Sequence, residues 1–318
     1  MNKIKTAVIG TGYLGKYHVE KFAQLPQSKL IAVCDINAEH SRALSEKYHV
    51  ATTTDYRSLV GEVDAVSIAT PTPSHFEIGN FFLENGIHVL LEKPIATTVK
   101  EADILIKTAK KNKVVLQVGH LERFNSVLKS ILPILTKPRF IESHRLAPFK
   151  LRGSDVNVVL DLMIHDIDII LSLVKSEITD IRANGSSVLT PFIDIANARL
   201  EFANGCVASV TASRVSIIND RRIRIFQNDC FIGLDLDRKK YRIHRKGGAE
   251  MFPGIPNIER EKKRIDKGDA LLEEIESFLN TILNKTNPVV TGEDAKKALY
   301  TAIKITQIVH ESEKRFCE

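Results

Sequence analysis

Short apolar runs alternate with longer amphipathic segments over the first 120 residues, and this alternation constrains the fold more than any other feature. The apolar runs occupy residues 5–10, 29–35, 63–70, 88–94 and 114–120, and the amphipathic segments occupy residues 16–25, 38–49, 74–86 and 98–113. Strands that alternate with helices of this length are typical of a parallel sheet with crossover helices. We therefore expect an α/β protein whose chain begins with such a sheet.

The turn between the first strand and the first helix has the pattern GxGxxG, at Gly10-Thr11-Gly12-Tyr13-Leu14-Gly15. The first glycine permits a tight turn, the second lets backbone approach a pyrophosphate, and the third lets helix and strand pack closely. The helix N-terminus then favours the anion. Together these features predict a Rossmann domain that binds a dinucleotide.

Asp35 ends the second expected strand, and Ile36 follows it in the same loop. A carboxylate at this position can accept hydrogen bonds from the adenosine ribose hydroxyls and would repel a 2′-phosphate. The nearest cation that follows is Arg42. The predicted cofactor is therefore NAD rather than NADP.

Two further loops follow expected strands, at the edge of a parallel sheet where ligands bind. The loop 69–75 offers Thr70, Pro71, Thr72 and His75, although His75 could equally be a helix-start residue that faces solvent. The loop 91–96 carries Glu92 and Lys93 ahead of a proline, which restricts the backbone of Lys93. We predict that both loops contribute to the cofactor site, and that Lys93 projects at its edge.

The segment 161–174 places acids and a histidine inside the most apolar stretch of the second half. On an α-helix, Asp161, His165 and Asp168 would share one narrow stripe, with apolar residues covering nearly all the rest. Asp166 lies off this stripe and would face an edge or another partner. A polar stripe on a buried helix must be satisfied or must line a cavity.

Three interpretations of that stripe differ in chemistry. An internal Asp–His ion pair would be structural. A metal site would need a third ligand, which is not evident in the sequence. Acid–base chemistry suits a histidine, whose pKa lies near neutral pH, with Asp161 one turn away to orient its ring. We favour the third interpretation.

The rest of the chain predicts a second domain. Residues 199–216 and 221–245 have the pattern of successive antiparallel strands, and residues 269–316 have that of two helices around a loop. A length of 318 residues is sufficient for two domains. We place the NAD-binding domain at 1–122 and the substrate-binding and oligomerisation domain at 123–318, with the last helix able to pack back on the first domain.

Composition excludes several classes of protein. No apolar run is long enough to span a membrane, and the N-terminus lacks a signal-peptide pattern, which favours a cytoplasmic protein without a membrane partner. The four cysteines form no CxxC pair, as expected for reduced thiols. A net charge of +6, densest at 238–267, has no accompanying nucleic-acid-binding motif, so we expect a solvated basic face.

The order GxGxxG, Asp35, 69–75 and then Glu92-Lys93-Pro94 resembles the glucose–fructose oxidoreductase / inositol dehydrogenase family (Gfo/Idh/MocA). The resemblance implies a C-terminal α+β domain with a large open, mostly antiparallel sheet. It implies NAD-dependent oxidation of a secondary hydroxyl, with Lys93, Asp161 and His165 as the catalytic residues. Whether Lys93 or His165 takes the proton stays open. Pairing through the open sheet, which would otherwise expose apolar area, implies a homodimer or homotetramer.

Three segments, residues 118–127, 144–152 and 153–166, resemble the branch of the family that acts on nucleotide sugars. That resemblance implies oxidation of UDP-N-acetylglucosamine at C3, giving a 3-keto sugar for later amination in lipid A-type glycolipid synthesis. The candidate substrate-binding residues are Arg123, Asn125, Arg145, Arg152 and His165. Each arginine could instead form a surface or interdomain ion pair. Two other functions stay open: dehydrogenation of a free sugar or polyol such as myo-inositol, and a non-catalytic NAD-binding regulator.

Overall fold

A computed structural model describes residues 3–151, 153, 156–265 and 268–316. The chain divides into two compact units. Unit 1 comprises Met1–Phe124 and Asp269–Leu299, and unit 2 comprises Asn125–Gly268 and Tyr300–Glu318. The last helix, α8 (Gly292–Phe316), therefore contributes to both units.

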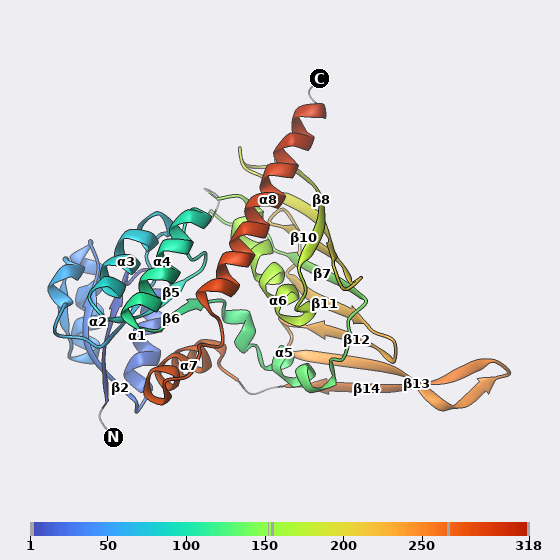
Figure 1. Ribbon diagram of the computed structural model, residues 1–318, viewed down its shortest axis with the longest axis horizontal. Coiled ribbons are helices and arrows are strands. Elements are labelled where there is room, and N and C mark those ends of the chain that lie inside the picture. Colours follow the sequence, from blue (N-terminus) through green and yellow to red (C-terminus); the bar gives the residue numbers. More distant parts are fainter. Residues whose placement is uncertain (1–2, 152, 154–155, 266–267, 317–318) are drawn as a thin grey trace. The chain divides into compact units, whose positions relative to one another are not determined.

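Unit 1 is built on a six-stranded, all-parallel sheet with the order β3-β2-β1-β4-β5-β6, so the expected α/β fold is confirmed (Figure 1). Its strands are β1 (Ile4–Ile9), β2 (Ser28–Cys34), β3 (Ala51–Thr53), β4 (Ala65–Ile68), β5 (His88–Glu92) and β6 (Leu116–Gly119). Its helices are α1 (Gly15–Gln24), α2 (Ala38–Tyr48), α3 (His75–Glu84), α4 (Val99–Asn112) and α7 (Ala270–Asn284), with short turns η1 (Tyr56–Leu59), η2 (Thr72–Ser74) and η3 (Leu121–Phe124). The strand order reverses between β1 and β4, which makes their carboxyl ends the expected ligand crevice.

Local signals in the sequence start and stop these helices. Thr98 caps α4 by accepting a hydrogen bond from the Glu101 N–H, and the Glu101 carboxylate accepts one from the Thr98 N–H in return. This reciprocal capping box satisfies two backbone donors that the first helical turn leaves unpaired. The helix ends at Lys113, which adopts the left-handed conformation at φ 55°.

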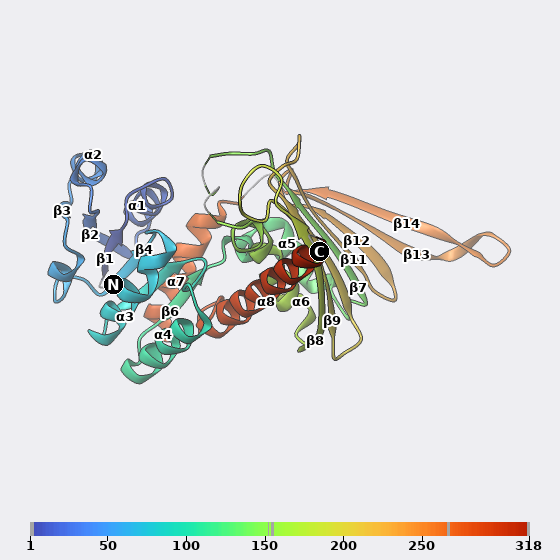
Figure 2. The ribbon, with the colours of Figure 1, turned by 90° about the horizontal axis from the view of Figure 1, so that it is seen from above.

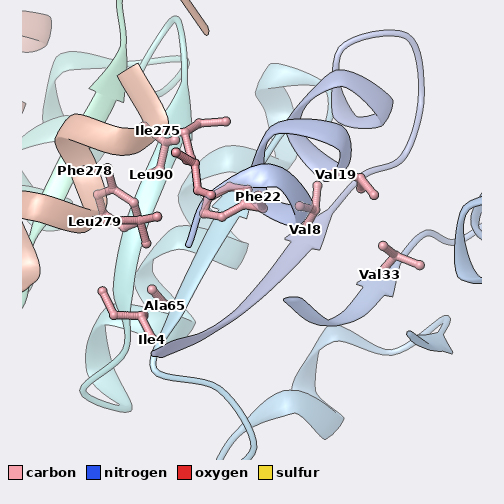
Figure 3. Packing of buried hydrophobic residues seen from close by; sticks show 11 residues of the cluster. Ile4, Val8, Val19, Phe22, Val33, Ala65, Leu90, Ile275, Phe278 and Leu279 are labelled. Carbon is pink, nitrogen blue, oxygen red and sulfur yellow. The ribbon is translucent and has the colours of Figure 1, made fainter. Parts of the chain in front are cut away.

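The core of unit 1 combines segments that are far apart in the sequence. Figure 3 shows Val8 of β1, Phe22 of α1 and Leu90 of β5 beside Ile275 and Phe278 of α7. All five side chains are at most 1% exposed. Burying an apolar side chain of this size stabilises the fold by roughly 1.5–3 kcal/mol. Helix α7 therefore belongs to the first unit although it follows the whole of the second unit's sheet in the chain.

Unit 2 contains an eight-stranded sheet with the order β14-β13-β12-β11-β7-β10-β9-β8. Its strands are β7 (Phe140–Leu146), β8 (Ile178–Ser186), β9 (Ile195–Phe202), β10 (Val207–Ser213), β11 (Asp220–Phe226), β12 (Cys230–Asp235), β13 (Lys240–Phe252) and β14 (Ile255–Arg264). Only β7 and β10 pair in parallel, so the expected mostly antiparallel sheet is confirmed. Unit 2 also contains α5 (Ser126–Ile131), the turn η4 (Leu132–Ile134), the π-helical turn η5 (Val159–Met163) and α6 (Ile164–Val174).

The two faces of this sheet differ. Helix α6 and the C-terminal part of α8 cover one face (Figure 2), where Val309 of α8 lies against Gly185 of β8. The other face presents alternate residues that are mostly charged or polar, including Glu142, Asn197 and Arg224. Arg224 donates to the Glu142 carboxylate at 3.2 Å. The same face also carries the contacting rings of Phe140, Phe226 and Phe231, so it is mixed, and the expectation that it pairs with a second copy stays a prediction.

Most of the basic region predicted at 238–267 lies in the hairpin of β13 and β14, from Lys240 to Arg264. Only Lys240–Arg245 of β13 pairs with β12, and the remainder pairs with β14 alone. The hairpin therefore extends beyond the other strands, as Figure 1 shows. Within the described residues, no helix is long and apolar enough to cross a membrane.

Candidate active site

The glycine-rich turn has the geometry that a dinucleotide requires. Gly10 adopts a left-handed φ of 84°, and a Cβ on Gly15 would lie 1.8 Å from the Gly10 carbonyl oxygen. Neither position accepts another residue without backbone movement. Gly12 is exposed, and a Cβ built on it would meet no atom within 4 Å. The backbone beside Gly12 is thus open to a pyrophosphate, and the turn fits the cofactor.

Asp35 lies at the carboxyl end of β2 and is held by the glycine-rich turn. Its Oδ2 accepts from the Thr11 N–H at 2.7 Å and from the Thr11 hydroxyl at 3.0 Å, and its Oδ1 accepts from the Asn37 N–H at 2.9 Å. These bonds fix the carboxylate at the crevice edge. Thr11, predicted as a cofactor contact, therefore also positions Asp35. Binding of the ribose hydroxyls by Asp35 stays a prediction.

Two hydrophobic side chains at this crevice face solvent. Tyr13 is 57% exposed and Ile36 is 94% exposed. Tyr13 contacts Tyr17 edge to face at 5.7 Å, and the Lys16 ammonium lies 5.1 Å from both ring centroids. Leu14 precedes the first residue of α1 and is half-buried. Tyr13 and Ile36 are thus accessible to an adenosine, as their predicted role requires.

His75 is the first residue of α3, but it is buried rather than facing solvent, so the helix-start alternative is wrong in that respect. Its Nδ1 lies 2.8 Å from the Pro94 carbonyl oxygen, and its Nε2 lies 2.9 Å from the Thr70 carbonyl oxygen. Burial lowers the pKa of His75 below its usual 6.5, although both carbonyls oppose the effect. His75 therefore links the loop after β4 to the loop after β5. Pro71 is the residue before η2, and Thr72 is the first residue of that turn.

Glu92 and Lys93 end β5, and Lys93 is joined to Pro94 by a cis peptide bond. The Glu92 carboxylate lies 3.0 Å from the His18 Nε2, and the His18 Nδ1 lies 2.8 Å from the Ser67 hydroxyl. Burial raises the pKa of Glu92, but His18 and the nearby charges of Lys93 and His75 outweigh it, and the pKa lies below its usual 4.5. Glu92 is therefore an anion, and its contact with His18 holds the carboxyl end of β5, next to Lys93.

Sequence reasoning missed His18 and Ser67. The signal was present, because residues 15, 18, 19 and 22 recur at helical spacing and are the buried residues of α1. A histidine on the inward stripe of a helix indicates a buried polar partner.

In unit 2, the expected continuous α-helix from Asp161 is wrong. Val159–Met163 is a π-helical turn, and α6 begins at Ile164. A π turn inserts an extra residue, so the spacing of 100° per residue does not hold across Asp161 and His165. Both side chains are half-buried, whereas Asp168 is buried. π turns occur frequently at functional sites, which agrees with the predicted catalytic role of these two residues.

A loop close to Asp161 is fixed by residues that sequence reasoning did not identify. A Cβ built on Gly153 would lie 3.0 Å from the Asp161 carboxylate. Arg214 donates to the Gly153 carbonyl at 2.6 Å and also to the Val156 carbonyl. The Asp194 carboxylate lies 3.5 Å from the Arg214 Nε. A buried arginine and aspartate therefore hold the backbone that approaches Asp161.

The predicted substrate-binding residues have different environments. Arg145 is 3% exposed on β7 and donates to the Asp166 carboxylate at 2.5 Å. This ion pair is buried inside unit 2, not at the surface or between domains as the alternative for Arg145 had it, and it is the partner left open for Asp166. The Asn125 side chain accepts from the Val127 N–H and caps α5. Arg123 is half-buried in η3, and Arg152 lies outside the described residues. A ligand role for these four residues stays a prediction.

The described residues contain no group of three or more histidine, cysteine or acidic side chains that could hold a metal ion. Cys34, Cys206 and Cys230 are buried free thiols. Burial, with the charges of Asp35 and Asp55, raises the pKa of Cys34 to about 12. A thiol that stays protonated in this way is a poor nucleophile.

Comparison with known proteins defines the class. Residues 4–120 match the NAD-binding Rossmann-fold domain of the Gfo/Idh/MocA oxidoreductases, and residues 142–229 match a C-terminal domain of the same family. The chain is 38% identical over 306 residues to UDP-N-acetylglucosamine 3-dehydrogenase of Acidithiobacillus ferrooxidans. These aligned residues span 96% of this chain and 97% of that protein. The chain belongs to the Gfo/Idh/MocA oxidoreductase family, and its first domain is an NAD-binding Rossmann fold.

A solved structure of that enzyme and two less similar relatives extend the comparison. The solved structure of the Acidithiobacillus ferrooxidans enzyme, GnnA, superposes with a TM-score of 0.90 at 35% identity and covers 97% of this chain and 98% of its own. A myo-inositol 2-dehydrogenase of Thermotoga maritima is 27% identical over 93% of both chains. A scyllo-inositol dehydrogenase structure from Lactobacillus casei, at 20% identity, 98% coverage of both chains and a TM-score of 0.82, shares the fold.

Proposed function

We propose that this chain is an NAD-dependent dehydrogenase that oxidises the C3 hydroxyl of UDP-N-acetylglucosamine to the 3-keto sugar. The observation that carries the proposal is the similarity, over nearly the whole length of both chains, to an enzyme named for that reaction. The similarity extends through the second domain. The half-buried Asp161 and His165 at a π turn support the same chemistry.

In this proposal His165 accepts the hydroxyl proton, because an imidazole titrates near neutral pH. Asp161 orients the imidazole and stabilises its charged form. Lys93 donates a hydrogen bond to the reacting oxygen and stabilises its alkoxide character. The alternative assignment, in which Lys93 takes the proton, predicts that a Lys93 variant alters the pH profile of turnover more than a His165 variant does.

The residues that would hold NAD are the glycine-rich turn, Asp35 and the loops after β4 and β5. Gly12 leaves room for the pyrophosphate, and the first turn of α1 supplies backbone N–H groups. Asp35 would accept from the adenosine ribose, with Tyr13 and Ile36 beside it. When bound, the oxidised nicotinamide serves as the acceptor of the hydride from the sugar carbon.

The test is NADH formation with UDP-N-acetylglucosamine and NAD⁺, with a glutamate-dependent aminotransferase present to remove the ketone. Free N-acetylglucosamine and myo-inositol serve as parallel substrates. We expect turnover with the UDP-sugar alone. Turnover with a free polyol at equal efficiency would contradict a nucleotide-sugar substrate.

Dehydrogenation of a free polyol is the second candidate function, favoured by the inositol dehydrogenase relatives at 27% identity and below. It requires no site for a diphosphate. If it is correct, removing the UDP group should leave kcat/KM nearly unchanged. A non-catalytic NAD-binding regulator would instead bind NADH without turning over any of the three compounds.

The biological setting is also part of the proposal. A 3-keto UDP-sugar is a substrate for amination, which places the enzyme before a transaminase in lipid A-type glycolipid synthesis. We propose a cytoplasmic homodimer or homotetramer that uses the open face of the unit 2 sheet as its interface. The partly exposed rings of Phe140, Phe226 and Phe231 on that face would be covered by the second copy. Light scattering that gives a monomer mass would contradict the oligomer.

A further inference from the structure

Glu274, on the inward face of α7, is a buried acid that the proposed chemistry does not use. Its side chain is fully buried, and among the described residues neither carboxyl oxygen has a hydrogen-bond donor. A carboxylate charge in such a place is strongly unfavourable, so the neutral acid is the stable form. A protein that retains an acid here accepts a loss of stability that glutamine or leucine would avoid.

The elements around Glu274 connect it to the strand end that carries Lys93. Helix α7 packs against β5, α1 and η3. Gln117 of β6 donates to the Glu274 backbone carbonyl at 3.1 Å, which fixes α7 to the sheet. Glu92 of β5 is the acidic neighbour, and its charge adds to burial in raising the pKa of Glu274 well above the usual 4.5.

Glu92 already has a full set of partners. It accepts from His18 at 3.0 Å and from the Lys93 N–H at 3.3 Å, and its carboxyl carbon is 3.1 Å from the place where a Cβ on Gly119 would lie. Because Gly119 has no side chain, the carboxylate can occupy the space above β6. Two adjacent carboxylates cannot both be charged without strong repulsion. A charge on Glu274 would therefore act first on Glu92.

Among the described residues, no other ionisable group on these elements donates a hydrogen bond to the Glu274 carboxyl. On α1, His18 is bonded to Glu92 and Ser67, and Lys21 forms its ion pair with Asp269 at 3.0 Å. On η3, Glu122 and Arg123 lie on the element packed beside α7. Among the described residues none of them donates to the Glu274 carboxyl.

We propose that Glu274 is a positioning residue for Lys93. Because Glu274 is a neutral acid, Glu92 is the one anion of this pair at the carboxyl end of β5. Glu92 then accepts hydrogen bonds from both His18 and the Lys93 backbone. Ionisation of Glu274 would displace Glu92 and loosen the loop that carries Lys93. The inference rests on the proposed function only in taking Lys93 as a catalytic residue. The protonation of Glu274 and its effect on cofactor binding can be measured without any substrate.

The first experiment is infrared spectroscopy of the full chain at neutral pH. A neutral carboxylic acid has a carbonyl stretch that is separate from the carboxylate bands. We expect this band in the wild type, its loss in Glu274→Gln, and its retention in Glu276→Gln, a matched change two residues along the same helix. Absence of the band in the wild type, or its persistence in Glu274→Gln, would overturn the proposal.

The second experiment follows NADH binding by cofactor fluorescence as the pH is raised. The chain has no tryptophan, so the protein contributes little background. We expect NADH to bind the wild type less tightly once Glu274 ionises. The affinity for NADH falls about tenfold for each unit by which NADH binding raises the pKa of Glu274. Glu274→Gln, which is always neutral, should bind as the wild type does at neutral pH and lose less affinity on the alkaline side. Identical pH profiles in both proteins would overturn the positioning role.

A second variant keeps the test valid if Glu274→Gln does not fold. Glu92→Gln removes the neighbouring charge, so the neutral-acid band of Glu274 should disappear at a lower pH than in the wild type. A band that titrates at the wild-type pH would show that the two acids are independent, against the proposal. If no sugar is turned over but both sets of spectra behave as expected, the proposed function fails and the coupling of Glu274 to the cofactor loop stands.

Discussion

Arg145 allows a structural role to be separated from a substrate-binding role by a single substitution. The pair that it forms with Asp166 lies between β7 and α6, where the two residues are 3% and 1% exposed. Asp166 also accepts a hydrogen bond from the Ser143 hydroxyl at 2.7 Å. Replacing Arg145 with methionine keeps an unbranched apolar stem but removes the guanidinium, so the Asp166 charge stays buried with the Ser143 hydroxyl as its remaining donor from β7.

The expected loss of stability is large. Removing one partner of a buried ion pair costs about 3–5 kcal/mol, because the remaining charge is uncompensated. For a domain of roughly 150–250 residues this corresponds to a fall in Tm on the order of 6–20 °C. Replacing both partners, as in R145M/D166L, should recover most of the loss, since an apolar pair of similar volume is often as stable as the ion pair.

The assay is thermal unfolding of R145M, D166L and the double variant, followed by circular dichroism. R57M is the matched control, because Arg57 makes the same kind of pair with Glu77 at 2.8 Å but with both side chains exposed. The control substitution should lower the free energy of unfolding by less than about 1 kcal/mol. An R145M protein that unfolds at the wild-type temperature but has a raised KM for the nucleotide sugar would refute the argument and make Arg145 a ligand.

Three further predictions address the cofactor and catalytic sites. His165→Asn and Lys93→Met should each lower kcat by about 10²–10⁴-fold, the usual contribution of acid–base groups, with NADH binding by His165→Asn unchanged in calorimetry. Gly15→Ala should abolish NADH binding, because its Cβ would lie 1.8 Å from the Gly10 carbonyl oxygen; wild-type affinity would show that the turn can relax. The folded-state pKa of Glu274 lies above 4.5, so its contribution to stability is present at lower pH and is lost as the pH rises toward that pKa. The Tm advantage of Glu274→Gln over the wild type should therefore grow as the pH rises above 4.5, and a constant difference would contradict it.

The fold of the first 120 residues could be predicted because its signals are local. Apolar strands, amphipathic helices and a glycine-rich turn each occur within a short window, and the chain order then determines a parallel sheet. The short strand Ala51–Thr53 was missed because three residues show no periodicity. The prediction allowed only the last helix to pack back on the first unit and placed α7 in the second, because an apolar helix face shows that it must be buried but not against which element.

The sites differ in how far sequence could identify them. Gly10, Asp35 and Lys93 follow from motifs whose spacing has a direct physical reason. His18 and Arg214 do not, because each depends on a partner elsewhere in the chain, Glu92 and Asp194. Such buried polar contacts are determined by tertiary packing, and a single sequence contains no record of which polar group meets which.

The helix that contains Asp161 and His165 shows why periodicity fails at a functional site. A regular α-helix over 161–174 would place Asp161, His165 and Asp168 on one stripe, and a buried stripe of three ionisable groups would need three sets of partners. The π turn at Val159–Met163 changes the angle between Asp161 and the residues of α6. Asp166 and Asp168 are buried, Asp166 against Arg145, while Asp161 and His165 are half-buried. Fully buried and partly accessible ionisable groups thus come from one short segment. An irregular turn costs backbone energy, and that cost is explained if only Asp161 and His165 must reach a substrate.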